Sequence, residues 1–306
     1  MRVYRPAASA AAVCLAVLTN LLTGGGPARA EDPIFVSWSQ VLVSWTDEYV
    51  PTSENPCVAG RPTCVRLTIE EMQRRFRPLA ATCSHQAVFS LAYLRTTQEY
   101  KRAAEEKGFF EDVRFVNHED AVFAKYYFDA YDAWAADRLR RVPKAWRIAF
   151  DAARDRQVTG SGNLLLGINA HVNRDLPFVL AAIGLVKPDG TSRKPDHDKV
   201  NVFLNRVVEP LIAEEAQRFD PTMDDAETPY GLSYTALMQM LVAWRETAWR
   251  NAERLVSAPD AAARAAVADD IEAYAASNAR AFVTQYQYGP LSSSARRDAY
   301  CAAQQD

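Results

Sequence analysis

Residues that commonly carry chemistry are scarce in this chain of 306 residues, which has four histidines and five cysteines. The sequence contains no Gly-x-Ser-x-Gly motif, no His-Glu-x-x-His motif, no phosphate-binding loop and no dinucleotide fingerprint. The familiar signatures of α/β-hydrolases, zinc proteases and nucleotide-dependent enzymes are therefore missing, and no nucleotide cofactor is expected.

Neither sign of charge dominates the sequence, since the formal net charge is −3 and no block of like charges occurs. A protein that binds nucleic acid through a basic surface is therefore disfavoured. No basic amphipathic helix is visible, which argues against a membrane-surface protein. With 49% hydrophobic residues, the chain has enough apolar material for a folded core and is not a disordered protein.

The first thirty residues predict a secretory signal peptide. Arg2 and Arg5 precede an apolar run over 7–22, and the triplet Ala28-Arg29-Ala30 follows a glycine cluster. A charged start, a short apolar stretch and an A-x-A ending favour cleavage after Ala30 and a secreted protein without a membrane span. A retained anchor is the alternative, but Asn20 and the glycines interrupt the run.

Cleavage there would leave four cysteines, and an even number in an exported chain predicts two disulfides. Cys57 and Cys64 flank a short loop and are expected to pair. Cys83 and Cys301 would then join the C-terminal tail to an early helix. A cysteine metal site is the alternative, but the sequence has no Cys-x-x-Cys spacing.

Long runs of apolar residues at helical spacing dominate the chain, and alternating strand patterns are nearly absent. We therefore expect an all-α fold, a single helical bundle-like domain with an N-terminal arm. The expected parts are the signal peptide 1–30, an arm and disulfide loop 31–66, the helical domain 67–290 and a tail 291–306. Expected helices include 163–184, 197–219, 231–257 and 260–286.

Helix starts are predicted from capping residues. Thr68 with Glu71 resembles a capping box, and Pro78 is expected in the first turn of a helix that reaches about Lys107. Asn117, followed three residues later by Asp120, resembles another cap.

The most specific candidate site is the string Gly-Ile-Asn-Ala-His-Val-Asn-Arg-Asp-Leu-Pro over 167–177. Its spacing places His171 and Asp175 on one helix face, where they could bind one metal ion or the acid could orient the ring. Gly167, one turn earlier, would let a ligand or a second helix approach closely. The alternatives are a surface ion pair or a satisfied polar network in the core.

The other histidines also fall at expected helices, so a bundle core could gather them around one divalent metal ion such as zinc. His197 and His85 are the further candidate ligands. Asp120 or Asp198 would be another ligand or the base for a bound water. For Asp120 a capping role is the alternative, and for the histidines a hydrogen-bonded place in the core.

Three segments, Cys83 to Phe89, Gly167 to Pro177 and Ser192 to Asn201, resemble an uncharacterised bacterial family common in actinomycetes. The likeness covers most of the chain after residue 30. It implies a helical fold and supplies no established activity. Relatives often carry acids where this chain has Ser84 and Gln86, which makes a metal site around His85 poorer here.

More loosely, the helical fold and the His171–Asp175 spacing resemble secreted zinc phospholipases C and related nucleases. That resemblance implies a phosphoester substrate. Those enzymes hold three zinc ions with more histidines than this chain has, together with an N-terminal amine and an adjacent tryptophan, whereas the expected mature N-terminus here is Glu31.

Two functions follow as hypotheses. The first is a secreted metal-dependent hydrolase in which His171, Asp175, His197 and His85 hold the metal. The second is a non-catalytic secreted protein whose buried His/Asn/Asp network fixes the helix packing while the protein binds a small apolar ligand or a cell-envelope partner.

Overall fold

A computed structural model describes residues 44–224, 233–289 and 292–305. The expected signal peptide and most of the expected arm lie outside these residues. The regular elements of the described residues are all helices, and only isolated β-bridges accompany them, at Val158 with Gln287 and Val186 with Ser192. The all-α expectation is therefore confirmed. None of the helices in the described ranges is long and apolar enough to cross a membrane.

The helices follow one another along the chain through mostly short connections. Their bounds are α2 Pro62–Ala81, α3 Gln86–Glu105, α4 Val113–Ala135, α5 Lys144–Arg154, α6 Gly160–Ile168, α7 Leu176–Ile183, α8 Lys194–Arg218, α9 Tyr234–Ser257, α10 Ala261–Gln285 and α11 Ser294–Ala303. Short 3₁₀ turns occur at η1 Leu139–Arg141 and η3 Pro221–Asp224. Between α6 and α7 lies a π-helix, η2 Asn169–Asp175.

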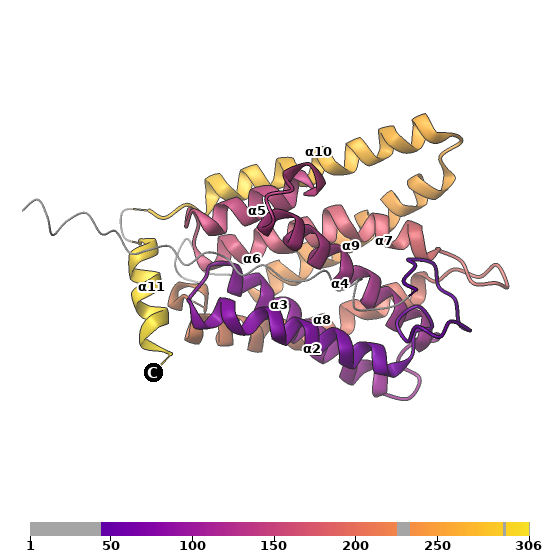
Figure 1. Ribbon diagram of the computed structural model, residues 1–306, viewed down its shortest axis with the longest axis horizontal. Helices are drawn as coiled ribbons and strands as arrows, with labels where there is room; N and C mark the ends of the chain where they lie inside the picture. Colours follow the sequence, from indigo (N-terminus) through magenta and orange to yellow (C-terminus); the bar gives the residue numbers. More distant parts are fainter. Residues whose placement is uncertain (1–43, 225–232, 290–291, 306) are drawn as a thin grey trace, which may run out of the picture. The chain divides into compact units, whose positions relative to one another are not determined.

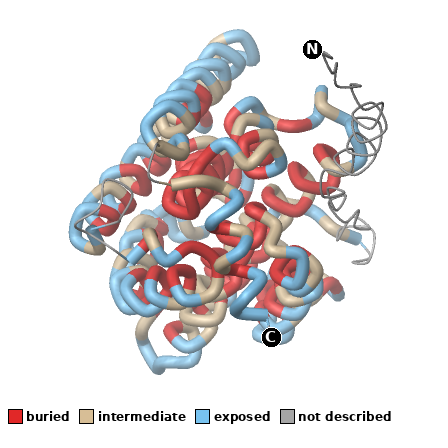
Figure 2. The backbone as a smooth tube through the Cα atoms, turned by 90° about the vertical axis from the view of Figure 1, so that its left-hand side faces the viewer, coloured by how far each residue is buried: buried red, intermediate tan, exposed pale blue. Residues whose placement is uncertain are grey.

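The helices pack around the segment formed by α6, η2 and α7. In Figure 1, α2 and α3 lie on one side of this segment and α10 on the other. η2 is in contact with α4, α5, α9 and α10, and α3 packs between α2 and α8. Figure 2 shows that buried residues line the inward faces of the helices. The π-helix therefore lies in the interior of the bundle.

The observed helix starts differ from the expected ones. α2 begins at Pro62, so Thr68 lies inside it and donates its hydroxyl to Cys64 O at 3.0 Å instead of capping. Pro78 lies in the last turns of α2, and a new helix starts at Gln86. α4 is capped by Asp112, while Asn117 accepts a hydrogen bond from Tyr100 inside the bundle. Thr68 therefore bonds to the backbone of its own helix and Asn117 to a neighbouring helix, although both resemble caps in sequence.

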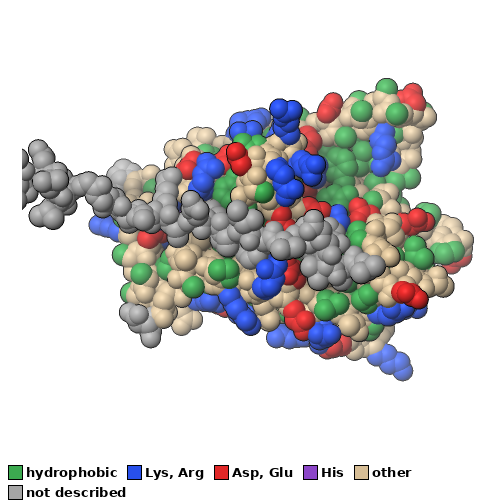
Figure 3. Space-filling view, viewed as in Figure 1, with side chains coloured by type: hydrophobic (Ala, Val, Ile, Leu, Met, Phe, Trp, Pro, Cys, Tyr) green, Lys and Arg blue, Asp and Glu red, His purple; other side chains and the backbone are tan. Residues whose placement is uncertain are grey.

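Both expected disulfides are present, Cys57–Cys64 and Cys83–Cys301. The first closes the loop before α2. The second joins the start of α3 to α11, a short helix within the expected C-terminal tail. On the face shown in Figure 3, basic and acidic side chains alternate without a patch of one sign, in agreement with the balanced composition.

Candidate functional site

The motif over 167–177 covers the last two residues of α6, the whole π-helix and the first two residues of α7. A Cβ added to Gly167 would lie 2.3 Å from ring atoms of Phe89 and 2.7 Å from its Cβ, so α3 packs directly against the glycine. The close approach of a second helix at this glycine is therefore confirmed. Pro177 has no N–H to donate to the carbonyl of Asn173, and its ring crowds that carbonyl. The wider π turn accommodates this conflict within an otherwise continuous helix.

Side chains of the π-helix anchor it to α10. Asn173 Nδ2 donates to Asn169 Oδ1 at 3.0 Å, and Asn169 Nδ2 donates to the carbonyl of Ala275 at 2.8 Å. Arg174 pairs with Glu272 of α10 at 2.5 Å. These bonds hold the π turn in one arrangement and so fix where its remaining side chains lie.

His171 and Asp175 lie side by side in the π-helix, with His171 Nδ1 and Asp175 Oδ2 3.2 Å apart. Asp175 is fully buried. Trp146 Nε1 also donates to Oδ2 at 2.7 Å, and Arg174 Nη1 donates to Oδ1 at 2.9 Å. Because a paired carboxylate only accepts hydrogen bonds, Nδ1 of His171 carries the proton and its Nε2 presents a lone pair.

Aromatic rings fix the plane of the His171 imidazole. The Phe123 ring stacks on it with centroids 3.4 Å apart and planes 6° apart, and the Tyr93 ring meets its edge at 4.5 Å. Burial lowers the pKa of His171, although Asp175 opposes that shift. The imidazole is therefore neutral at neutral pH, with Asp175 as the group that orients it.

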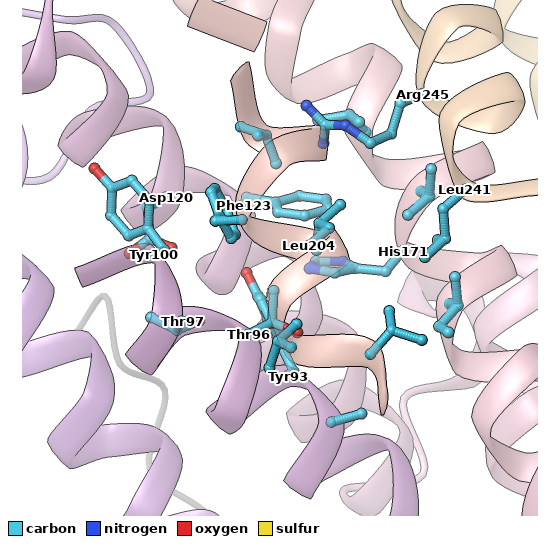
Figure 4. A pocket seen from close by; sticks show the side chains of 18 of the residues that line it. Tyr93, Thr96, Thr97, Tyr100, Asp120, Phe123, His171, Leu204, Leu241 and Arg245 are labelled. Carbon is cyan, nitrogen blue, oxygen red and sulfur yellow. The ribbon is translucent and has the colours of Figure 1, made fainter. Parts of the chain in front are cut away.

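His171 lines a cavity of about 130 Å³ between α3, α4, η2, α8 and α9, and its Nε2 is buried. Figure 4 shows side chains of these helices around this space. Most of the lining is apolar. The apolar lining residues include Leu164, Val200, Phe203, Leu204, Val208, Leu211, Leu237 and Leu241. The cavity therefore has a hydrophobic wall interrupted by a few polar groups.

Five of those polar groups have a buried atom with no hydrogen-bond partner among the described residues. We call them the cavity polar atoms: Tyr93 Oη, Thr97 Oγ1, Asp120 Oδ2, His171 Nε2 and Arg245 Nε. A buried polar atom without a partner costs about 1–3 kcal/mol. Five such atoms around one cavity therefore indicate that something else supplies their partners.

Burial strongly shifts the pKa values of the ionisable side chains around the cavity. Burial, with the neighbouring Glu119 as the second cause, raises the pKa of Asp120 to about 8. Burial likewise raises the pKa of Glu119 to about 7, with Arg245 opposing the shift. Burial also lowers the pKa of Arg245 to about 10. At neutral pH Asp120 is therefore mostly a neutral acid, able to donate a hydrogen bond.

The structure brings together only part of the predicted site. His171, Asp175 and Asp120 lie at or beside the cavity, whereas His85 lies elsewhere, bonded to Asp298 at 3.1 Å. Asp198 is half-exposed and pairs with a lysine one turn earlier in α8.

His197 is buried outside the cavity lining. Its Nε2 lies 3.2 Å from the carbonyl oxygen of Arg245, and Arg245 Nη2 lies 3.2 Å from its Nδ1. No group of three or more His, Cys, Asp or Glu side chains within residues 44–224, 233–289 and 292–305 is arranged to hold a metal ion.

Three residues with cavity polar atoms, Tyr93, Thr97 and Arg245, were not predicted as site residues. Tyr93 and Thr97 lie on α3, four residues apart, in the same stripe as Phe89 and Tyr100, all of which are buried. The available signal is polar hydroxyls within an inward-facing stripe. The apolar residues of a cavity wall have the same helical spacing as residues packed in a core. The sequence alone therefore could not show that this stripe lines a cavity.

Comparison with known proteins gives a family and no activity. A model described as a family of unknown function, DUF5995, matches residues 65–285. No curated protein and no solved structure matched the chain.

Proposed function

The chain belongs to DUF5995, a family of unknown function, and we propose that it binds a small, mostly apolar organic molecule in the cavity beside His171. The observation that carries this proposal is the set of five cavity polar atoms without protein partners. Pockets for small molecules combine an apolar lining with a few convergent polar groups and perturbed pKa values, as this cavity does.

The size of the cavity limits the ligand. Its volume of about 130 Å³ is close to that of an engineered apolar cavity of roughly 150 Å³ that takes up benzene. A dry apolar cavity would leave the polar atoms unsatisfied. A ligand of about one ring with one or two oxygen atoms would fill the space and pair with those atoms.

The cavity offers a ligand both polar and apolar contacts. Tyr93, Thr97 and Asp120 supply hydroxyl and carboxyl groups from α3 and α4, and Arg245 supplies a guanidinium from α9. Leu237 and Leu241 offer only apolar contact. A molecule with an apolar body and a polar edge fits this distribution better than a sugar or a nucleotide, whose many polar groups would lack partners.

We propose in addition that the protein is exported, with residues 1–30 as its signal peptide. The two disulfides support this, because disulfides persist in oxidising compartments.

Binding can be tested with simple probes and matched variants. Benzyl alcohol and cyclohexanone are titrated into the purified protein while the melting temperature Tm is measured. At about 100 times Kd a ligand adds ~2.7 kcal/mol of stability, so Tm should rise with probe concentration.

Val208→Phe fills the cavity and should abolish this rise. The matched control is Val202→Phe on the same helix, where the valine is 46% exposed, and it should respond as the wild type does. If no probe raises the wild-type Tm, or if Val208→Phe responds equally, the proposal is wrong.

A second proposal is a divalent metal at His171 and Asp175, leading to a metal-dependent hydrolase of phosphoesters. The proximity of these two side chains supports it. Metal analysis of the protein purified without a histidine tag should then find about one equivalent of zinc, manganese or iron per chain. The His171→Ala variant should no longer contain this metal. Less than about a tenth of an equivalent, unchanged by that substitution, would reject it.

A further inference from the structure

The geometry around His171 points to a chemical role beyond binding. We propose that His171 is a general base that removes a proton from a carbon next to the carbonyl group of a small apolar ketone, while Tyr93 and Asp120 donate hydrogen bonds to the carbonyl oxygen. This inference rests on the proposed function, because the ketone must occupy the cavity.

The base is built by the π-helix. His171 Nδ1 is 3.2 Å from Asp175 Oδ2, and the same oxygen accepts a 2.7 Å hydrogen bond from Trp146. The carboxylate therefore has little freedom to move, and it holds the imidazole in the tautomer whose free lone pair is at Nε2. That atom has no partner in the described parts of the chain and lies in the cavity wall. Oriented imidazoles of this kind are general bases.

The donors face the same space from α3 and α4. Tyr93 Oη and Asp120 Oδ2 are both buried and unpartnered in the described ranges, and both residues line the cavity that His171 lines. A carboxylate without a partner in an apolar cavity would be costly, so Asp120 carries a proton that it can donate. A tyrosine and a neutral carboxylic acid are donors suited to an oxyanion that develops in an apolar site.

The reaction needs no other reactant. Nε2 of His171 takes the proton from the α-carbon, and the C–H electron pair becomes the C=C bond of an enolate while the carbonyl electron pair moves to the oxygen, whose charge Tyr93 and Asp120 stabilise by hydrogen bonds. Asp175 stabilises the imidazolium that forms. In a β,γ-unsaturated ketone the imidazolium then returns the proton to the γ-carbon. The product is the conjugated isomer, with the same atoms and the same oxidation state.

The test uses β,γ-cyclohexenone, a ketone with a single six-membered ring, and follows the ultraviolet absorbance of the conjugated product. The wild-type protein should isomerise it at least about 100-fold faster than an equal concentration of free imidazole. His171→Gln should reduce the rate to the background. Tyr93→Phe should lower it at least about tenfold without impairing folding, because it removes only an unpartnered hydroxyl.

His118→Gln is the matched control. His118 is equally buried, but its ring contacts the carbonyls of Cys57 and Asp47, away from the cavity lining. The substitution should leave the isomerisation rate unchanged. A loss of activity in His118→Gln as large as in His171→Gln would overturn the assignment of the base.

Asp175 is a positioning residue in this scheme, so its test includes a spectroscopic readout. Nitrogen NMR of the four histidines should show His171 as the neutral Nδ1–H tautomer. Asp175→Asn should shift it toward the Nε2–H tautomer and slow isomerisation at least about tenfold. An Nε2–H tautomer in the wild type would refute the scheme, because Nε2 could not then accept a proton.

The two proposals fail in different ways. Binding of β,γ-cyclohexenone is measured separately by saturation-transfer NMR. If the ketone binds but isomerises no faster than with imidazole, the acid–base role is wrong and the binding proposal stands. If neither this ketone nor the alcohol and ketone probes bind, both proposals are wrong.

Discussion

A neutral Asp120 makes a quantitative prediction about stability and pH. In the unfolded chain its carboxyl has the ordinary pKa of 3.8, and in the folded protein burial raises that pKa to about 8. Between these values the folded protein holds a proton that the unfolded chain has released. The free energy of unfolding must therefore fall as the pH rises from about 4 to about 8.

The size of the effect follows from the pKa change. At 1.36 kcal/mol per pKa unit, the shift from 3.8 to about 8 corresponds to ~6 kcal/mol at high pH. This is an upper limit, because real protein interiors respond to charge with an effective dielectric constant of about 20. We therefore expect a measurable loss of stability, smaller than ~6 kcal/mol, that is attributable to Asp120.

Asp120→Asn isolates this contribution, since asparagine has the shape of the neutral acid and does not titrate. Urea unfolding of both proteins at several pH values should show a flatter decline in the variant, and the curves should diverge as Asp120 ionises. Glu119 contributes a decline of the same sign in both proteins, and the part of the Asp120 shift that Glu119 causes is included in the difference between them. Asp198→Asn, at a half-exposed surface position, should decline as the wild type does. Equal slopes in Asp120→Asn and the wild type would show that Asp120 is ionised in the folded protein.

Three further predictions concern stability. Gly167→Ala should lower the free energy of unfolding by about 1–3 kcal/mol, since its Cβ would clash with Phe89 and overpacking exceeds the helix-propensity gain; a urea midpoint equal to or above that of the wild type would contradict this. Thr97→Val removes an unpartnered hydroxyl and should raise Tm, by about 1 kcal/mol in stability; a fall would mean that the hydroxyl has a partner. Replacing Cys83 and Cys301 by alanine should cost ~2–5 kcal/mol and expose the α11 segment to limited proteolysis, whereas an unchanged cleavage pattern would show that α11 is held without the disulfide.

The fold was predictable from the sequence because helical periodicity reports burial directly. The ends of the later helices lay within a few residues of the expected positions, as for α9 and α10. The starts of α2 and α4 were not predictable, because Thr68 and Asn117 have side chains suited to caps but bond within the bundle. Such a side chain can form its hydrogen bond either as a helix cap or within the folded bundle, and local propensity does not show which of the two occurs.

The candidate site was only partly predictable. The pairing of His171 with Asp175 follows from spacing along one helix. Asp120 lies near these residues because η2 packs against α4. No spacing along the sequence encodes that packing. The expected convergence of His85 failed for a simple reason, since Asp298 from the distant α11 gives that ring a nearer partner.

Unpartnered buried atoms alone would not identify this site, because another set exists. Glu215 and Arg297 also have buried atoms without hydrogen-bond partners in the described residues. Burial and the neighbouring Glu214 raise the pKa of Glu215 well above its ordinary value, with Arg297 opposing the shift, and neither Glu215 nor Arg297 lines the cavity. The cavity polar atoms surround an apolar space large enough for a ligand, and His171 lies on a π turn, a departure from regular α-helix. Natural proteins often retain such departures from regular structure where function requires them, and this coincidence is the reason we propose the cavity as the functional site.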